Sequence, residues 1–463
     1  MRPCYDTRTR CHPADLPTMF DHSRARFEEL ARSVLDRAAR LGATAASTDV
    51  SESSGLSVNV RKGKVETIEQ TRDKGIGVTV YVGHRRGHAS TSDFGDAAIE
   101  QTVRAAYEIA RFTGEDPCAG LPDEGSLARV PRELDLFHPW TIEADGAIEI
   151  AREMEAAAFA VDRAVVNSEG AGVSISHGHF VSANSLGFVG GYPYSRHSIA
   201  CAPIARRGRA MQRDDWYSAA RHPERLADPA SVGRYAAERA LARLGARKLG
   251  TCKVPVLFES PLACGLLGHF VQAASGSALY RKASFLVDAL GTDVFAAHLD
   301  IDEDPHRLGE FGSTPFDDEG VATSARRVVD GGTLGGWFLS TYSARKLGMK
   351  TTGNAGGAHF LRLSSRLTRP RDDLRAMLRK LDTGLFVTEL LGHGVNGVTG
   401  DYSRGASGYW VEGGEIRHPV EEITIAGNLR EMFRAIVAVG ADEIVRGSRC
   451  SGSVLIDRMA VAG

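Results

Sequence analysis

Hydrophobic residues recur at helical spacing in several stretches of this chain. Between residues 27 and 41 the apolar positions fall three or four apart, and Gly42 follows, which predicts an amphipathic helix that ends there. The same spacing predicts helices over residues 96–113, 145–160 and 231–244. Each of these helices has one apolar face, so each needs a partner layer to cover it.

Alternation of apolar with small or polar positions predicts strands between these helices. Residues 56–60 alternate in this way, Lys62-Gly63 offers a turn, and the sequence from Val65 onward suits a return strand. Further strands are predicted over residues 75–82, 87–92, 173–176, 180–183 and 198–205. Helices and strands in this order predict an α+β fold, with a mixed or antiparallel sheet and flanking helices.

A change in pattern near residues 247–250 marks the main domain boundary. A buried strand is predicted over residues 252–259, followed by a helix with Ser260 as its expected N-cap and Pro261 as its first residue. Beyond this helix, glycine-rich sequence with short apolar runs predicts a curved, β-rich architecture of hairpins. We therefore divide the chain into a tail (1–18), an N-terminal α+β unit (19–120), a middle segment packed with it (121–245) and a C-terminal β-rich domain with a strand–helix entry (246–463).

Composition narrows the classes of function. The chain has 463 residues, 43% of them apolar, which is enough for a large core in two or three domains. Its 56 basic and 58 acidic residues nearly cancel, which argues against nucleic acid or an anionic membrane as a partner. The seven cysteines form no Cys-x-x-Cys pair, which favours reduced thiols in a cytoplasmic protein. We find no apolar segment of membrane-spanning length and no signal peptide, and we expect the polar residues 1–18 to be disordered.

Two histidine pairs have a spacing that metal ligands use. His84 and His88 lie four residues apart, and His177 and His179 share one face of a predicted strand. Neither pair has a third ligand nearby, and the glycine and arginines around His84 suit an exposed hairpin end. We interpret both pairs as structural or solvent-exposed, with metal binding as the alternative.

The segment 399–410 combines three glycines with an aspartate and an arginine three residues apart. Glycine permits close backbone approach, so one interpretation is a contact with an extended peptide or a partner through Asp401, Ser403 and Arg404. The interpretation that we favour is a local turn closed by an ion pair between Asp401 and Arg404.

Seven blocks of sequence follow one another in a single order that is not expected by chance. The blocks are Asp116-Pro-Cys-Ala-Gly120, Asp135-Leu-Phe-His-Pro139, Tyr280-Arg-Lys-Ala-Ser-Phe-Leu286, Ser313-Thr-Pro-Phe-Asp-Asp-Glu-Gly320, Ser343-Ala-Arg-Lys-Leu-Gly348, Thr399-Gly-Asp-Tyr-Ser-Arg-Gly405 and Glu422-Ile-Thr-Ile-Ala-Gly-Asn-Leu429. Together they resemble the TldD/PmbA family, and specifically its PmbA branch, also called TldE. The resemblance extends along nearly all of the chain from about residue 19.

In the TldD branch of that family, a helical His-Glu-x-x-x-His motif binds zinc and supplies the general base. Zinc-assisted hydrolysis needs two imidazoles on one helix face, a further ligand and a carboxylate beside the metal. Aligned on Leu266-Leu267, the three motif positions here hold Gly268, His269 and Ala273, so neither ligand histidine is present. A shift of the alignment by one residue does not restore the motif. The resemblance therefore implies a chain with no catalytic residue and no metal of its own.

His269 occupies the glutamate position of the motif, and Arg281 and Lys282 follow the predicted helix. An imidazole without a metal can titrate near neutrality, but it cannot activate water for amide hydrolysis at a useful rate. We interpret His269 as a polar residue that lines an interface or cavity, with a relic base or a group that contacts substrate as the alternative. Arg281 and Lys282 either steer acidic peptide segments or form a solvated surface pair, and we favour the solvated pair.

The resemblance implies the non-catalytic subunit of a heterodimeric zinc metalloprotease. In such complexes a TldD-type subunit carries the zinc, and the PmbA-type subunit packs against it to enclose a site that acts on unfolded peptides and leader peptides. An enclosed site admits an extended chain, which main-chain hydrogen bonds can hold, and excludes folded domains. The alternatives are a protein-binding regulator of the modulator of DNA gyrase type and an independent hydrolase with an unrecognised site. Whether the chain forms a homodimer when alone is left open.

Overall fold

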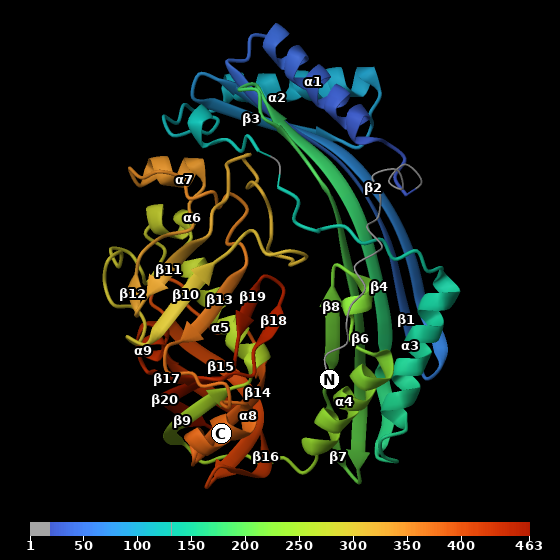
Figure 1. Ribbon diagram of the computed structural model, residues 1–463, viewed down its shortest axis with the longest axis vertical. Coiled ribbons are helices and arrows are strands. Elements are labelled where there is room, and N and C mark those ends of the chain that lie inside the picture. The colour runs from blue at the N-terminus through green and yellow to red at the C-terminus, as the bar shows by residue number, and fades with distance from the viewer. Residues whose placement is uncertain (1–18, 131) are drawn as a thin grey trace.

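The computed structural model describes residues 19–130 and 132–463, and the predicted disordered tail lies outside the described residues. A long, curved sheet with helices on its outer face forms the N-terminal half, and two smaller sheets form the C-terminal half on the inner side of the curve (Figure 1). None of the described helices is long and apolar enough to cross a membrane. The α+β fold class predicted from the sequence is confirmed.

The N-terminal sheet has eight strands, all paired antiparallel, in the order β3-β2-β1-β4-β6-β7, with β5 on β4 and β8 on β6. Because β1 pairs with β4, the segments 19–120 and 121–245 build one sheet. The strands are β1 (Ala45–Arg61), β2 (Lys64–Val82), β3 (Arg85–Thr91), β4 (Val165–Asn184), β5 (Val189–Gly190), β6 (Pro193–Arg207), β7 (Ala210–Arg213) and β8 (Trp216–Ala220).

These strands are longer than the sequence pattern predicted. β2 is one strand where two were predicted, because residues 64–74 are exposed on both faces and therefore lack the apolar alternation that identifies a strand. β4 likewise joins two predicted strands through the polar but buried stretch His177-Gly-His179. Apolar alternation thus identifies only the portions of these strands that pack against a hydrophobic layer.

Four helices cover the outer face of this sheet. The first, α1 (Arg24–Arg40), begins at Ser23, whose side chain accepts a hydrogen bond of 3.2 Å from the backbone N–H of Arg26, and it buries the predicted apolar face. The others are α2 (Asp96–Phe112), α3 (Ala144–Phe159) and α4 (Pro229–Ala242). All four helices agree with the predicted ones to within a few residues at each end.

The two faces of the sheet differ in character. Beneath the helices, alternate residues of β1 and β4 such as Val50, Val58, Val173 and Ile175 are almost completely buried. The opposite, inner face faces the C-terminal half. It carries small polar side chains: Ser47, Ser51, Ser53 and Ser57 from β1, and Ser174, Ser176 and Ser182 from β4.

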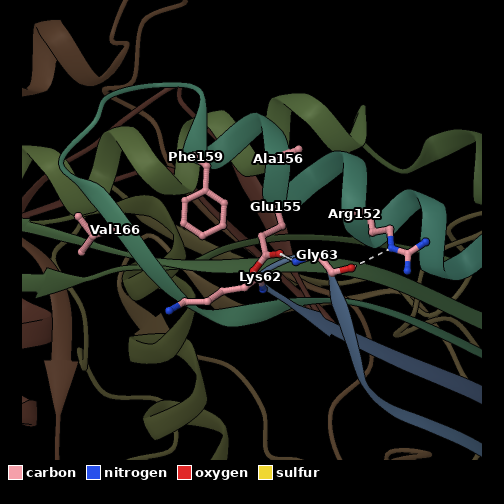
Figure 2. A pocket seen from close by; sticks show the side chains of 7 residues that line it. All are labelled: Lys62, Gly63, Arg152, Glu155, Ala156, Phe159 and Val166. Atoms are coloured by element: carbon pink, nitrogen blue, oxygen red, sulfur yellow. Dashed lines mark hydrogen bonds between the residues drawn. The ribbon is translucent and has the colours of Figure 1, made fainter.

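The predicted turn at Lys62-Gly63 closes the β1–β2 hairpin. Both residues have positive φ (51° and 70°), as two-residue hairpin turns require. Glu155 of α3, only 1% exposed, accepts a 2.8 Å hydrogen bond from each of their backbone N–H groups, and Arg152 Nε donates to the Gly63 carbonyl at 3.1 Å. Figure 2 shows these side chains around a pocket of about 460 Å³. We interpret this pocket as a structural feature, in which side chains of α3 stabilise the turn by hydrogen bonds.

The C-terminal half contains two six-stranded sheets, which are largely antiparallel. Two pairs, β9 with β14 and β13 with β19, are parallel, so the half is not built of hairpins alone. One sheet has the order β12 (Thr333–Leu334), β11 (Arg326–Asp330), β10 (Leu299–Glu303), β13 (Leu361–Ser365), β19 (Arg449–Ser451) and β18 (Ile444–Arg446). The other has the order β16 (Glu415–Asn428), β15 (Asp401–Glu412), β14 (Gly384–Leu391), β9 (Cys252–Phe258), β20 (Val454–Ala462) and β17 (Ile436–Val439).

Helices in this half are short, apart from the one that follows β9. That helix is α5 (Ser260–Ala273). The N-cap is Glu259, so the prediction of Ser260 as N-cap is wrong. Ser260 is instead the first helical residue, and its hydroxyl donates 2.8 Å to the Asp442 carbonyl. The remaining helices are α6 (Gly276–Tyr280), α7 (Thr341–Lys346), α8 (Leu374–Leu381) and α9 (Leu429–Arg434).

Two arginines at the C-terminal end of α4, Arg239 within the helix and its C-cap residue Arg243, join the two halves. Arg239 Nη1 lies 2.6 Å from Glu259 Oε1 of the C-terminal half, and Arg239 Nε lies 3.2 Å from Asp214 Oδ1. Arg243 Nη2 lies 2.5 Å from Glu389 Oε2. These ion pairs hold α4 against the start of α5 and the end of β14.

Candidate functional site

Helix α5 lies against the β18–β19 hairpin and is buried along most of its length. Leu266, Leu267 and Phe270 are each at most 3% exposed. The Cys264 thiol lies 3.6 Å from the backbone oxygens of Ile444 and Arg449, so the helix is tightly apposed to the hairpin. This packing brings the motif positions of α5 next to Arg449, a residue far away in the sequence.

The three motif positions do not fit a zinc ion. Gly268 has no side chain, and a Cβ atom added there would lie 2.8 Å from Arg449 Nη1. Ala273 is 2% exposed and has no donor atom, which leaves His269 as the one group with a free electron pair. A cationic guanidinium thus lies where a zinc site would need anionic or neutral donors. Across residues 19–130 and 132–463, no three His, Cys, Asp or Glu side chains are placed to hold a metal.

His269 is half-buried between Tyr402 and two arginines. Its ring lies edge-on to the Tyr402 ring, with 6.0 Å between centroids. Burial, and then the positive charges of Arg404 and Arg449, hold the pKa of His269 below its ordinary value. The imidazole is therefore neutral at physiological pH and has no carboxylate to orient it as a general base.

Residues 401–410 are strand rather than turn, and the strand separates the residues that the sequence grouped. In β15, Tyr402 and Arg404 lie on the face toward α5, whereas Asp401 and Ser403 lie on the opposite, exposed face. The predicted ion pair between Asp401 and Arg404 is therefore wrong. Asp401 instead accepts hydrogen bonds from Thr399 Oγ1 (2.7 Å) and Asn428 Nδ2 (3.2 Å), and these bonds lower its pKa.

Comparison with known proteins places the chain in a family. Its residues 47–110, 137–244 and 251–463 match models of the first, central and C-terminal domains of the PmbA/TldA metallopeptidases. The chain belongs to the PmbA/TldD family. Metalloprotease PmbA of Escherichia coli O157:H7 is 47% identical to it over 414 residues, which cover 89% of this chain and 91% of that protein.

Two crystal structures share the fold of this PmbA/TldD family member. A protein of Bacteroides thetaiotaomicron, described as a candidate modulator of DNA gyrase, superposes with a TM-score of 0.88 at 26% identity and covers 94% of this chain and 98% of that one. TldE of Thermococcus kodakarensis superposes with a TM-score of 0.81 at 18% identity, covering 94% and 99% respectively, which shows a common fold.

Arg281 and Lys282 lie in the turn after α6 and are exposed. Arg281 Nε donates 2.8 Å to the Ser277 carbonyl, and Lys282 has a positive φ of 54°. No contact among the described residues links either side chain to His269. Their positions agree with a solvated surface pair.

The histidine pairs lie outside this site. His84 is exposed at the β2–β3 turn, as predicted, and His88 is exposed with Nδ1 3.1 Å from Thr79 Oγ1. His177 is buried, its Nε2 accepts 3.0 Å from the Trp140 backbone N–H, and burial lowers its pKa to about 4. His179 is also buried, with Nε2 2.7 Å from a Glu52 carboxylate oxygen. These contacts give the second pair a structural role.

Sequence analysis missed a cavity of about 660 Å³ between the inner face of the N-terminal sheet and loops of the C-terminal half. Asp49 and Tyr81 of the sheet face Asp318 and Tyr342 across it. Burial raises the pKa of both the Asp49 and the Asp318 carboxyl groups. No signal in the sequence links these segments, because the cavity exists only where the two halves meet. Tyr402 and Arg449 were missed because they come from separate strands of the C-terminal half that only its folding brings to α5.

Proposed function

We propose that this chain is the non-catalytic, TldE-type subunit of a heterodimeric zinc metalloprotease that acts on unfolded peptides and leader peptides. A TldD-type partner supplies the zinc. The observation that supports the proposal is the lack of zinc ligands at the motif positions of α5. Gly268 and Ala273 offer no ligand atom, and Arg449 lies against Gly268. A member of a metallopeptidase family whose motif positions do not fit zinc requires a second chain for hydrolysis.

The inner face of the long sheet supports a role in enclosing a peptide. Its small side chains leave open space above β1 and β4, and loops of the C-terminal half stand opposite Ser47 and Ser182 across the interdomain cavity. An extended peptide could lie in such a space, where serine hydroxyls can form hydrogen bonds to its main-chain groups with little demand on its sequence. A folded domain would not enter it.

A protein-binding regulator is the second candidate function. The likeness to the Bacteroides protein, described as a candidate modulator of DNA gyrase, favours it. The formal net charge of −2 argues that such regulation would act through protein contacts rather than through DNA. A regulator would bind its target without any peptidase partner, and this property separates it from the first candidate.

Reconstitution tests the proposal. The purified chain should hold no stoichiometric zinc by elemental analysis and should cleave no unfolded peptide. When it is mixed with a TldD-type subunit that has an intact His-Glu-x-x-x-His motif, we expect a 1:1 complex by analytical ultracentrifugation and cleavage of an unfolded peptide. About one tightly held metal per isolated chain would contradict the proposal. So would full activity of the partner alone.

A further inference from the structure

The guanidinium groups of Arg404 and Arg449 converge on His269 from two different sheets. Arg404 is on β15 and Arg449 is the first residue of β19, and both side chains are half-buried. Arg449 Nη1 lies against Gly268, one residue before His269 in α5. The absence of a side chain at Gly268 makes room for this guanidinium.

Neither arginine has a partner within the described part of the chain: neither forms a side-chain hydrogen bond or a salt bridge there, and neither stacks on an aromatic ring. Arg404 Nε is a buried donor with nothing to donate to. A buried, charged donor without an acceptor costs free energy, so such groups in folded proteins are normally paired. With Arg449 as a second, half-buried cation near the same histidine, this unpaired donor points to an anion that the described residues do not supply.

Tyr402 adds a third donor to this group. The residue is 1% exposed, and its hydroxyl has no hydrogen-bond partner among residues 19–130 and 132–463. Burial raises the pKa of Tyr402 to about 12, so the hydroxyl keeps its proton and can donate. The neighbouring imidazole of His269 is neutral. The group therefore presents donors and positive charge, with no carboxylate of its own.

We propose that Arg404, Arg449 and Tyr402 form a binding site for a carboxylate of an extended peptide. Planar guanidinium groups match the two oxygens of a carboxylate, and the tyrosine hydroxyl can donate a further hydrogen bond to it. The carboxylate is either the C-terminal group of the peptide or an aspartate or glutamate side chain. The site itself is independent of any partner, whereas its use in holding a peptide for cleavage rests on the proposed function.

Binding to the isolated, full-length chain tests this site. Fluorescence anisotropy would compare four labelled, unstructured peptides of one sequence: a free C-terminus with no acidic residue, an amidated C-terminus with one glutamate, both groups together, and an amidated peptide with glutamine. We expect the peptide without a carboxylate to bind at least tenfold more weakly than the best of the others. The first two peptides identify the source of the carboxylate. Equal affinity for all four peptides would overturn the proposal.

Variants locate the site. Arg404→Gln and Arg449→Gln should each weaken carboxylate binding about tenfold, and Arg449→Lys should recover part of the loss because it retains the charge without the planar fork. Tyr402→Phe should weaken binding without lowering the melting temperature, because its hydroxyl has no partner in the free chain. The matched control is Arg281→Gln, which also removes one positive charge, but from an exposed turn, and should leave binding unchanged.

The outcomes separate this site from the proposed function. If the control loses as much affinity as the Arg404 and Arg449 variants, the attraction is general electrostatics and the site is excluded. Displacement of the peptide by inorganic phosphate at concentrations where acetate has no effect would exclude a carboxylate site. If peptides with a carboxylate bind selectively while no TldD-type partner associates, the carboxylate site stands and the heterodimer proposal fails.

Discussion

Two groups of buried or half-buried arginines in this protein differ in what surrounds them. Arg239 of α4 and its C-cap residue Arg243, with side chains 12% and 8% exposed, are paired with Glu259, Asp214 and Glu389 at the joint between the two halves. Arg404 and Arg449, beside α5, are half-buried and have no carboxylate partner among the described residues. The residue type is the same in both groups, and the difference lies in the pairing.

The difference in pairing indicates a difference in role. At the joint, the charges of Arg239 and Arg243 are neutralised by carboxylates of the same chain. These ion pairs need no other molecule, and their role is to hold the two halves together. Beside α5, the positive charges of Arg404 and Arg449 are available to a ligand or partner outside the chain. Buried cations that are paired thus stabilise the fold, whereas unpaired ones indicate where a ligand or partner would bind.

The largest effect on stability is expected from a substitution at the joint between the two halves. Arg239→Gln removes the partner of Glu259 and Asp214, each only 7% exposed. Breaking a buried ion pair on one side costs about 3–5 kcal/mol, so the melting temperature followed by circular dichroism should fall by several degrees. Arg234→Gln on the same helix is the control: its side chain is 52% exposed, and its ion pair with Asp228 should contribute about 1 kcal/mol or less. Equal effects of the two substitutions would show that the joint does not depend on this pair.

A smaller effect on stability is expected beside α5. The double variant Arg404→Gln, Arg449→Gln leaves no carboxylate unpaired, so its free energy of unfolding should stay within about 1 kcal/mol of the unsubstituted chain. Denaturant unfolding of both proteins measures this difference. A loss as large as that of Arg239→Gln would mean that these arginines hold the fold together and would erase the contrast between the two groups.

The smallest effect is a change in the titration of His269. Its folded-state pKa is lowered by burial first and by the two arginines second, so stabilisation from the neutral imidazole is present above the unfolded pKa and is lost as the pH falls. Arg404→Gln or Arg449→Gln should raise this pKa, because the imidazolium then faces one positive charge fewer, but burial should keep it below the ordinary value. NMR titration of the His269 ring measures the change. Arg281→Gln should leave the curve in place, and an equal shift in that variant would contradict a local effect.

Local patterns predicted the helices well and the strands only in part. The helix over residues 24–40 was found because one face is buried against a sheet and leaves a periodic apolar signal. The exposed end of β2 has no such signal, since residues 64–74 are exposed on both faces and no hydrophobic layer covers them. Asp401 and Arg404 were joined in a predicted turn because their spacing suits one. In a strand the same spacing places them on opposite faces.

By itself, the sequence determined the α+β class through short-range periodicity, the membership of a metallopeptidase family through its resemblance to known members, and the lack of zinc ligands through the residue types at Gly268 and Ala273. Only the tertiary structure decided that Arg449 fills the space beside Gly268 and that Tyr402 and Arg404 face the same helix. Those contacts join segments far apart in the chain. Their geometry depends on how two sheets pack around α5, and no local pattern of residues encodes that packing.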